Sequence, residues 1–323
     1  MTSITAIVIL WVIIAESVIV SLGNLFTIFV FWKHRNKLKR TAFLLINLAV
    51  TDLLVGFGQL IVVKTFAFPQ QLEITSTKYG IIAAAFQGTF SFASLFCLAA
   101  ISLERAFALV WPLRHRVTSA KIYIYSIVFV WISAIFVGAS LLLAAYKVLD
   151  IELWNIALGI VAILALLIIC LSYLAIRRRL NCRVPPIDTA LNRQSGLQPN
   201  TKLSRTLFIV VAASLVFWLP STIINVLFFP RSFPVPIPLG YSGTLFYLAN
   251  SGVNPIIYSC RIPIFKETLK RMDIRNAQNN IELATELEIE DSSNKMYSLF
   301  KISNFNLNLA RTTIKVHALL FNH

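Results

Sequence analysis

Residues 122–146 read IYIYSIVFVWISAIFVGASLLLAAY, an unbroken apolar stretch that contains no Asp, Glu, Lys or Arg. The hydrocarbon core of a bilayer is about 30 Å thick, and a helix of roughly 20 residues crosses it. In lipid each backbone amide must find its hydrogen bond within the chain, and a helix achieves this locally. The stretch therefore predicts a transmembrane helix.

The rest of the chain has the same character. Of its 323 residues, 57% are hydrophobic and 13% are charged, whereas soluble domains are about half apolar and a quarter charged. We predict an all-α membrane protein, a seven-helix bundle over residues 5–260. Its crossings are expected at 5–32, 42–66, 79–110, 122–146, 153–176, 206–229 and 238–260.

The positive charge follows the predicted crossings. The net charge is +15, and 25 of the 29 Lys and Arg residues fall in alternate loops and in the segment after residue 260. Because basic residues bracket apolar runs instead of covering one face, we predict membrane lipid and not nucleic acid as the partner. A Lys and Arg excess marks the cytoplasmic side. Residues 1–4 are therefore expected outside and the tail, 273–323, in the cytoplasm.

A short amphipathic segment follows the last crossing. Residues 261–272 read RIPIFKETLKRM, with Ile262, Phe265, Leu269 and Met272 at helical spacing. Such a pattern is typical of a helix that lies on a membrane surface. We predict a short eighth helix over 262–272.

Polar side chains inside the crossings are costly and usually mark function. When the crossings are aligned from their basic ends, six such side chains fall at one depth: Asn24, Asp52, Ser94, Asn250, Ser251 and Asn254. They could satisfy one another, or Asp52 and Ser94 could help to hold a Na⁺ ion, because hard cations prefer oxygen ligands. Both alternatives stay open.

Two features suggest moving parts. Pro220 and Pro255 each lie within a crossing, where proline removes a helical hydrogen bond and bends the helix. Glu104 and Arg105 stand at the inner end of the third crossing. Such a pair is either a solvated charge pair or a switch in which the arginine exchanges its partner.

Two other classes of membrane protein were weighed. His34, His115, His317 and His323 all lie in predicted loops or in the tail, so no Ser-His-Asp set or histidine metal site is expected at membrane depth. An enzyme is therefore not predicted. A seven-helix transporter or channel is the alternative, although we find no repeated halves of the kind such folds often carry.

Taken together, these fragments resemble the rhodopsin-like (class A) G-protein-coupled receptors over residues 5 to about 272. One fragment falls in each of five crossings, in the order found in that family. They are GN at Gly23-Asn24, LAVTD ending at Asp52, SLERA around Arg105, FWLP around Trp218 and NSGVNPIIY ending at Tyr258. Within the family the chain looks most like the adenosine/melanocortin-type branch, where FWLPSTIIN and NSGVNPIIYSCRIPIF most resemble the adenosine receptors.

The resemblance implies a plasma-membrane receptor that binds a small extracellular ligand among its helices and activates a heterotrimeric G protein. It implies a sodium pocket around Asp52 as an allosteric site, and no other cofactor. Glu104, Arg105, Tyr173 and Tyr258 look like the inner switch that opens a cavity for the G protein. Asn200 stands where an acid often pairs with that arginine, so that pairing is expected to be absent.

The resemblance also places a ligand pocket near the outer end, with Trp218 as its floor. Its candidate residues are Gln87, Trp218, Ser221, Asn225, Thr244 and Tyr247, and hydrogen bonding between helices is the alternative role for each. Gln87 stands where amine receptors carry an aspartate, which disfavours an ammonium ligand. Asn225 matches an asparagine of adenosine receptors, which favours a nucleoside-like ligand, although Leu248 stands where those receptors have histidine.

Overall fold

The computed structural model of the chain describes residues 2–35, 42–66, 78–181, 199–228 and 237–272, together with Ile274 and Gln278. Within these residues the ordered elements are helices and no strand is found. The long helices are α1 (Thr2–Lys33), α2 (Ala42–Phe66), α3 (Lys78–Val110), α5 (Ala120–Ala145), α6 (Ile151–Asn181), α8 (Pro199–Phe228) and α9 (Ile237–Arg261). The predicted all-α fold is confirmed.

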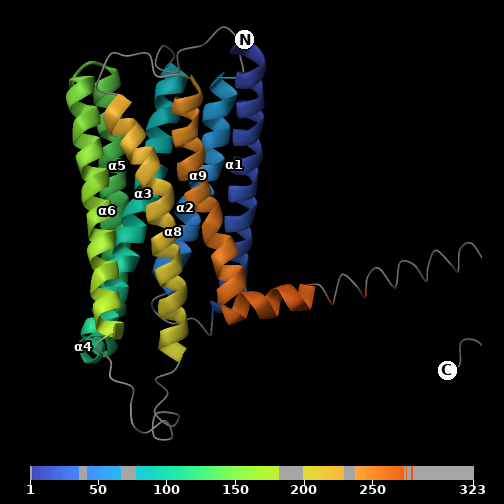
Figure 1. Cartoon of the computed structure of the whole chain (residues 1–323), viewed down its shortest axis with the longest axis vertical. Coiled ribbons are helices and arrows are strands. Elements are labelled where there is room, and N and C mark those ends of the chain that lie inside the picture. The colour runs from blue at the N-terminus through green and yellow to red at the C-terminus, as the bar shows by residue number, and fades with distance from the viewer. Residues whose placement is uncertain are drawn as a thin grey trace, which may run out of the picture. The chain divides into compact units, whose positions relative to one another are not determined.

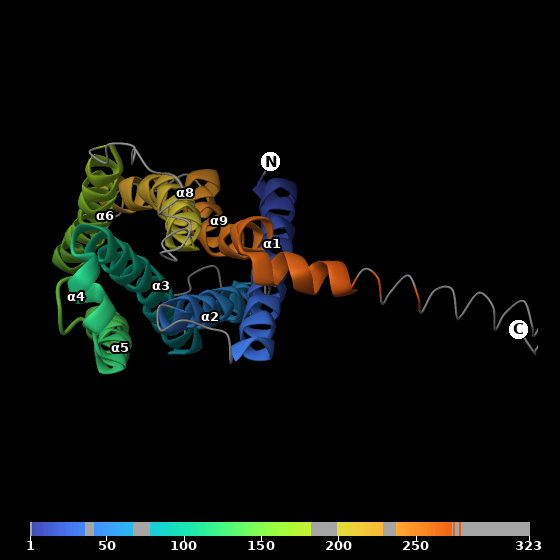
Figure 2. The same ribbon diagram turned by 90° about the horizontal axis from the view of Figure 1, so that it is seen from below.

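The long helices run up and down beside one another (Figure 1). Each packs against the next along the chain, and α9 packs back against α1, so that the helices close into a ring. Figure 2 shows this arrangement from below, along the helices. The third helix contacts α2, α5, α6 and α8, so a residue on α3 can face several elements at once.

The helix ends differ from the predicted crossings by a few residues. The first helix already begins at Thr2, so residues 2–4, expected to precede the bundle, are helical. A short helix, α4 (Pro112–Val117), was not predicted. Proline at its first position suits a helix start, where an amide hydrogen has no helical partner. Thr118 is extended, and Ser119 then caps α5 by accepting a hydrogen bond from the Lys121 amide at 3.3 Å.

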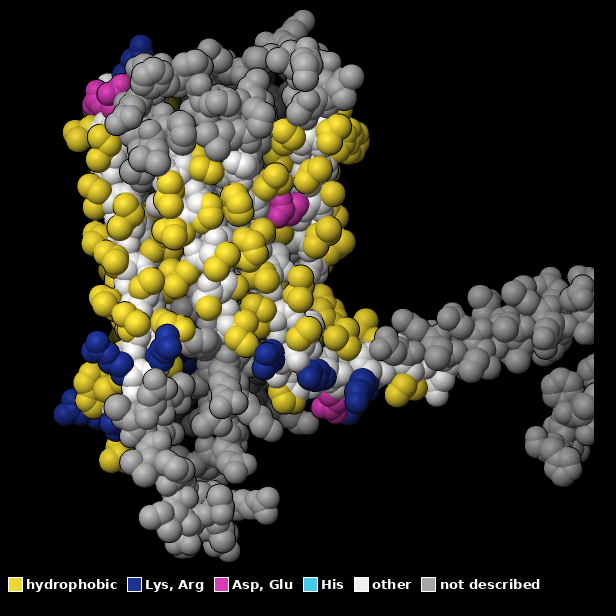
Figure 3. Space-filling view, viewed as in Figure 1, with side chains coloured by type: hydrophobic (Ala, Val, Ile, Leu, Met, Phe, Trp, Pro, Cys, Tyr) yellow, Lys and Arg dark blue, Asp and Glu magenta, His cyan; other side chains and the backbone are white. Residues whose placement is uncertain are grey.

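Five of the described helices are long and apolar enough to cross a membrane: α1, α2, α3, α5 and α6. The described part of α8 contributes a shorter apolar stretch, Ala212–Ile224. Helix α9 is less apolar because Asn250, Ser251 and Asn254 lie on it, and all three are buried inside the bundle. Figure 3 shows a broad hydrophobic band on the outside, with Lys and Arg gathered below it.

Small residues allow the helices to approach closely, as is common between transmembrane helices. A Cβ atom added to Gly56 of α2 would lie 2.6 Å from the Ser21 hydroxyl and 2.9 Å from the Ser17 carbonyl of α1. A Cβ atom on Gly138 of α5 would overlap the Thr89 hydroxyl of α3. At these glycines α1 lies close against α2, and α3 lies close against α5. Close packing of this kind positions the polar side chains of one helix relative to those of the next.

The chain divides into two compact units, residues 1–266 and 267–323. The first contains the bundle and the start of the segment after α9, where Phe265 is fully buried and packs its ring against Phe31 at 5.3 Å and Phe26 at 6.3 Å. In the second unit residues 267–272 are helical, and Arg271 pairs with Glu267 at 2.6 Å. The backbone is thus helical over 263–272, within the segment 262–272 for which the sequence predicted a short amphipathic helix after the last crossing.

Candidate functional site

The Asp52 carboxylate lies fully buried in the middle of the bundle and accepts three hydrogen bonds. The Ser94 and Ser251 hydroxyls donate to its Oδ1 at 2.6 and 2.8 Å, and the Asn254 amide donates to its Oδ2 at 2.8 Å. These partners come from α3 and α9, while Asp52 itself is on α2. The structure therefore brings together residues that sequence depth alone had placed at one level.

Asn24 of α1 joins the same cluster through the backbone of α9. Its amide donates to the Ser251 carbonyl at 3.1 Å and to the Val20 carbonyl of its own helix at 2.9 Å. Pro255 has no amide hydrogen, so the carbonyl four residues before it, that of Ser251, loses its helical partner. Asn24 supplies the missing donor. Gly23, whose added Cβ would lie 3.2 Å from the Pro255 ring, lets the two helices approach.

Several polar atoms of this cluster remain without a partner. Both side-chain polar atoms of Asn250, together with the Oδ1 atoms of Asn24 and Asn254, are buried and unpaired among the residues whose side chains the structure describes. A buried polar group without a partner costs about 1–3 kcal/mol. The cluster thus combines one carboxylate with spare amide oxygens and no described cationic side chain bonded to it.

A second polar network lies on the same three helices, α2, α3 and α9, on the side of the Asp52 cluster away from the basic end. The Tyr247 hydroxyl of α9 donates to Gln59 Oε1 of α2 at 2.5 Å and accepts from the Gln87 amide of α3 at 3.0 Å. The remaining Gln87 oxygen is buried without a described partner. The three side chains are neutral, so they offer hydrogen bonds to a ligand and no charge of their own.

The other candidate pocket residues fall on α8 and α9. Trp218 and Ser221 are buried, Thr244 is half-buried, and the Trp218 indole nitrogen has no described partner. The Trp218 ring packs edge-on against Phe92 of α3 at 6.3 Å. Asn225 is in α8, but its side chain lies outside the described residues, as does that of Asn200.

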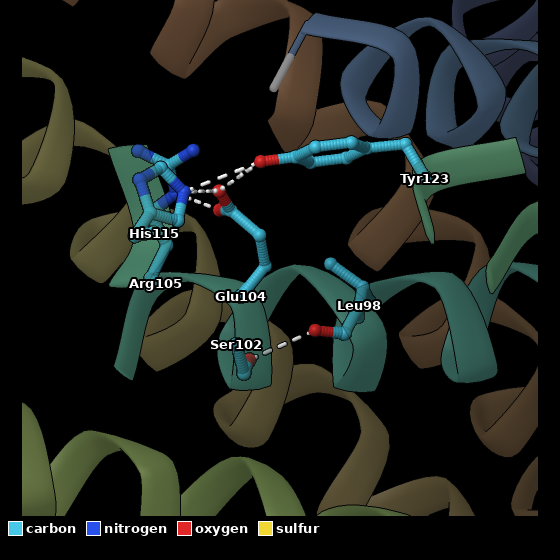
Figure 4. A network of polar contacts seen from close by, with 6 residues as sticks. All are labelled: Leu98, Ser102, Glu104, Arg105, His115 and Tyr123. Carbon is cyan, nitrogen blue, oxygen red and sulfur yellow. Dashed lines mark hydrogen bonds and ion pairs between the residues drawn. The ribbon is translucent and has the colours of Figure 1, made fainter. Parts of the chain in front are cut away.

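A third network stands at the basic end of the bundle, the end that carries Lys33, Arg114, Arg116 and Arg177. Glu104 forms an ion pair with Arg105, the next residue of α3, and both side chains are nearly buried. The Glu104 Oε1 atom also lies 2.7 Å from His115 Nε2 of α4. The Tyr123 hydroxyl of α5 lies 3.2 Å from both (Figure 4). One carboxylate thus ties three helices together.

The two tyrosines predicted to belong to this switch lie on α6 and α9. Tyr258 of α9 is fully buried, packs against Phe31 and Phe265, and its hydroxyl has no described partner. Tyr173 of α6 is half-buried. The described contacts of Tyr258 are thus with aromatic rings and not with the Glu104–Arg105 pair.

A wide apolar groove of about 1190 Å³ opens beside this third network, between α3, α5 and α6. Aromatic and aliphatic side chains such as Phe129, Phe136 and Leu164 form most of its wall. Glu104, His115 and Tyr123 also line it. The groove faces outward between helices of the bundle, so it borders the surroundings of the chain and not its interior.

Residues 23–258 match the family model described as "7 transmembrane receptor (rhodopsin family)". The matched segment covers most of the chain and all three networks. This chain belongs to the rhodopsin family of seven-transmembrane receptors. It is a rhodopsin-like G-protein-coupled receptor with a seven-transmembrane bundle, as predicted, and the matches favour this reading over the transporter or channel alternative.

Individual relatives are more distant. Somatostatin receptor type 5 of Rattus norvegicus is 25% identical over 280 residues, which cover 77% of this chain and 73% of the relative. Adenosine receptor A2a of Homo sapiens is 25% identical over 293 residues, 80% of this chain and 70% of the relative. Somatostatin receptor type 3 of Mus musculus is 27% identical over 290 residues, 79% of this chain and 65% of the relative.

Four residues that matter in this receptor were missed by sequence reasoning. Gln59 holds Tyr247, while His115 and Tyr123 hold Glu104. Asn47 links three helices, because it accepts from the Trp131 indole of α5 at 3.0 Å and donates to Cys97 of α3 at 3.4 Å. Gln59 and Asn47 carried a usable signal, since they are polar residues inside a predicted crossing.

Proposed function

We propose that this receptor sits in the plasma membrane with its amino terminus outside and its basic end in the cytoplasm. A small ligand bound near Gln87, Trp218 and Tyr247 would favour an arrangement in which the basic end opens for a heterotrimeric G protein. A ligand shifts such an equilibrium only through its different affinity for the two arrangements. The excess of Lys and Arg at the basic end supports the orientation.

The observation that carries the proposed coupling is the nearly buried Glu104–Arg105 pair at the basic end of α3. A buried ion pair holds its partners strongly once formed, and breaking it leaves two uncompensated charges. An open arrangement that gives the arginine a new partner on the G protein can compensate one of them. Arg105 is therefore the residue on which coupling depends.

The test is guanine-nucleotide exchange on G proteins added to membranes that contain the receptor. Arg105→Ala should reduce exchange to the level of membranes without receptor. Arg35→Ala is the matched control, because this exposed arginine just after α1 contacts only the Trp32 carbonyl among its described hydrogen-bond partners. This variant should support normal exchange. Unchanged exchange in Arg105→Ala would reject coupling through this residue.

We also propose that the Asp52 cluster holds a Na⁺ ion. The donor set fits, because a carboxylate, two hydroxyls and the unpaired amide oxygens of Asn250 and Asn254 are the oxygen ligands that hard cations prefer. An ion there would join α2, α3 and α9 and oppose their separation. Sodium chloride should then lower basal exchange relative to choline chloride at equal ionic strength. We expect a decrease of roughly fivefold, the lower end of the usual coupling between two binding sites.

Asp52→Asn is the variant that tests this site, because it keeps the shape of the side chain and removes the charge. Its basal exchange should be the same in both salts. A sodium effect that survives the substitution would place the ion elsewhere. Thr51→Ala is the control, since the Thr51 hydroxyl bonds the Leu48 carbonyl of its own helix and should leave the sodium effect intact.

The ligand class follows from the neutral network around Tyr247. Gln59, Gln87 and Tyr247 offer amide and hydroxyl groups, which suit an uncharged, hydrogen-bonding ligand such as a nucleoside better than an ammonium ion. The relatives include both adenosine and somatostatin receptors, so a peptide is the second candidate.

Nucleosides, peptides, lipids and amines should be compared for their effect on nucleotide exchange. A nucleoside response that Gln87→Leu and Asn225→Ala both weaken would support the proposal. A response restricted to amines, or a nucleoside response that both variants retain in full, would contradict it.

A further inference from the structure

The third network contains a histidine whose role no part of the proposed function uses. His115 projects from α4 toward α3, and its Nε2 atom lies 2.7 Å from Glu104 Oε1 (Figure 4). Glu104 already forms an ion pair with Arg105 through its other oxygen. Two groups that can carry a positive charge therefore share one nearly buried carboxylate.

Neighbours on α3 and α5 hold the imidazole in this position. The Tyr123 hydroxyl of α5 lies 3.2 Å from His115 Nε2. The Phe107 ring of α3 packs edge-on against the imidazole, with the ring centres 6.1 Å apart. Pro112 begins the short helix that carries it. The His115 side chain nevertheless remains 21% exposed, so protons from water can reach it.

Among the described residues, charged and titratable groups face His115 from α3 and α5. Glu104 and Arg105 face it from α3, and Tyr123 faces it from α5. On α4 itself Arg114 and Arg116 flank it in sequence, and Lys121 lies at the start of α5; these three side chains are exposed. The single carboxylate that balances His115 among the described residues is therefore Glu104, which Arg105 also needs.

Histidine is the side chain that normally changes charge between pH 5 and pH 8. A neutral imidazole can donate one hydrogen bond to Glu104 and leaves the pair with Arg105 undisturbed. A protonated imidazole adds a second positive charge on the same carboxylate, and it repels the arginine. Protonation therefore weakens the hold of Glu104 on Arg105.

Protonation also favours the state in which Arg105 has left. Without a second partner, departure of the arginine would leave Glu104 as a nearly buried, unpaired carboxylate, which is strongly unfavourable. A protonated His115 stays in contact and keeps that carboxylate neutralised. The open arrangement thus binds the proton more tightly than the closed one, and by linkage a lower pH shifts the equilibrium toward the open arrangement.

We infer that His115 is a positioning residue for Glu104, and that a proton on its imidazole releases Arg105 and raises the basal activity of the receptor. This inference rests on the proposed coupling through Arg105. The proton comes from the side of the membrane that the basic end faces. The basal activity of the receptor would then rise when that compartment becomes acidic.

The experiment measures basal nucleotide exchange on added G protein with the full chain in open membrane fragments, between about pH 5.5 and pH 7.5, the range in which histidine titrates. Every value is divided by the exchange of Arg105→Ala at the same pH, which removes the response of the G protein itself. The wild type should rise toward low pH by roughly fivefold, a modest coupling. His115→Gln, which keeps a hydrogen-bond donor but cannot be charged, should be flat.

His34→Gln is the matched control, because His34 is at the end of α1 and bonds the Val30 carbonyl of its own helix at 3.0 Å. It should keep the wild-type profile. His115→Arg carries a fixed charge and should show high exchange at every pH. A His115→Gln profile that rises with acid like the wild type, or low exchange in His115→Arg, would overturn the inference.

A second measurement does not depend on coupling. The heat-unfolding midpoint of the purified full chain in detergent should depend on pH differently in the wild type and in His115→Gln, because one of them exchanges a proton near Glu104 and the other does not. If Arg105→Ala exchanges normally while this difference is present, the proposed coupling has failed. If Arg105→Ala is inactive while both pH profiles coincide, the role of His115 has failed.

Discussion

Asp52 and Glu104 are two carboxylates of the bundle that are held in opposite ways. Asp52, in the middle of α2, accepts hydrogen bonds from the neutral side chains Ser94, Ser251 and Asn254. Glu104, at the basic end of α3, is paired with Arg105 and contacted by His115. The first carboxylate thus has only neutral partners among the described side chains, whereas the second is paired with a cationic side chain.

This difference indicates two different tasks. Neutral donors orient a carboxylate without cancelling its charge, so the Asp52 cluster retains an attraction for a cation. A cationic partner cancels the charge, and a change of partner at Glu104 therefore changes the energy of the whole basic end. The mid-bundle site is suited to holding helices together, and the basic-end site is suited to switching.

The largest expected effect comes from removing the mid-bundle carboxylate. Asp52→Ala would leave the three donors from Ser94, Ser251 and Asn254 buried without an acceptor. At about 1–3 kcal/mol for each unpaired group, the free energy of unfolding should fall by at least ~3 kcal/mol. Heat unfolding of the full chain in detergent measures this. Thr51→Ala, which removes a bond within one helix, is the control and should shift the midpoint much less.

Much of the mid-bundle site could be predicted from the sequence. Polar residues in apolar crossings are conspicuous, and the helix rise of 1.5 Å per residue places them at a common depth. Asp52, Ser94 and Asn254 were found in this way. Depth does not tell which polar atoms face one another, so the unpaired state of Asn250 and the backbone contact of Asn24 with Ser251 needed the structure.

The basic-end site was predicted in part. The adjacency of Glu104 and Arg105 in sequence suggested their ion pair, which the structure shows. The sequence predicted a loop at His115, because a helix of six residues has too few turns to show a periodic pattern. Its position in a loop then served only as an argument against an enzyme. Its contact with Glu104 depends on how α4 turns back beside α3, which no local sequence rule determines.

A smaller loss of stability should follow from removing one donor of the mid-bundle site. The Ser94 hydroxyl bonds the Asp52 carboxylate at 2.6 Å, and hydrogen bonds to charged groups contribute about 1.5–3 kcal/mol. Ser94→Ala should lower the free energy of unfolding by ~2 kcal/mol. Ser102→Ala is the matched control on the same helix, since its hydroxyl bonds the Leu98 carbonyl at 2.8 Å. Equal losses in the two variants would contradict a special role for the carboxylate.

At the basic end the expected effect is on activity. Glu104→Gln keeps hydrogen bonds available to His115 and Tyr123 but removes the charge that holds Arg105. The closed arrangement should lose about 1.4 kcal/mol, which corresponds to a tenfold rise in basal nucleotide exchange. Glu267→Gln removes an exposed pair with Arg271, and such surface pairs contribute little. Exchange in Glu104→Gln at or below the wild-type level would show that this carboxylate does not restrain the switch.

The smallest expected effect comes from removing a hydroxyl that helps to position Glu104 but carries no charge. Tyr123→Phe keeps the buried ring but removes the hydroxyl that lies 3.2 Å from both Glu104 and His115. Although one acceptor is a carboxylate, both contacts are long, so we expect a contribution near the lower end of the about 0.5–1.5 kcal/mol typical of a hydrogen bond, and basal exchange should rise by roughly two- to threefold. The pH profile should remain that of the wild type, because His115 still meets Glu104 at 2.7 Å. A flat pH profile in Tyr123→Phe would instead mean that the hydroxyl, and not the carboxylate alone, is what makes the imidazole respond to acid.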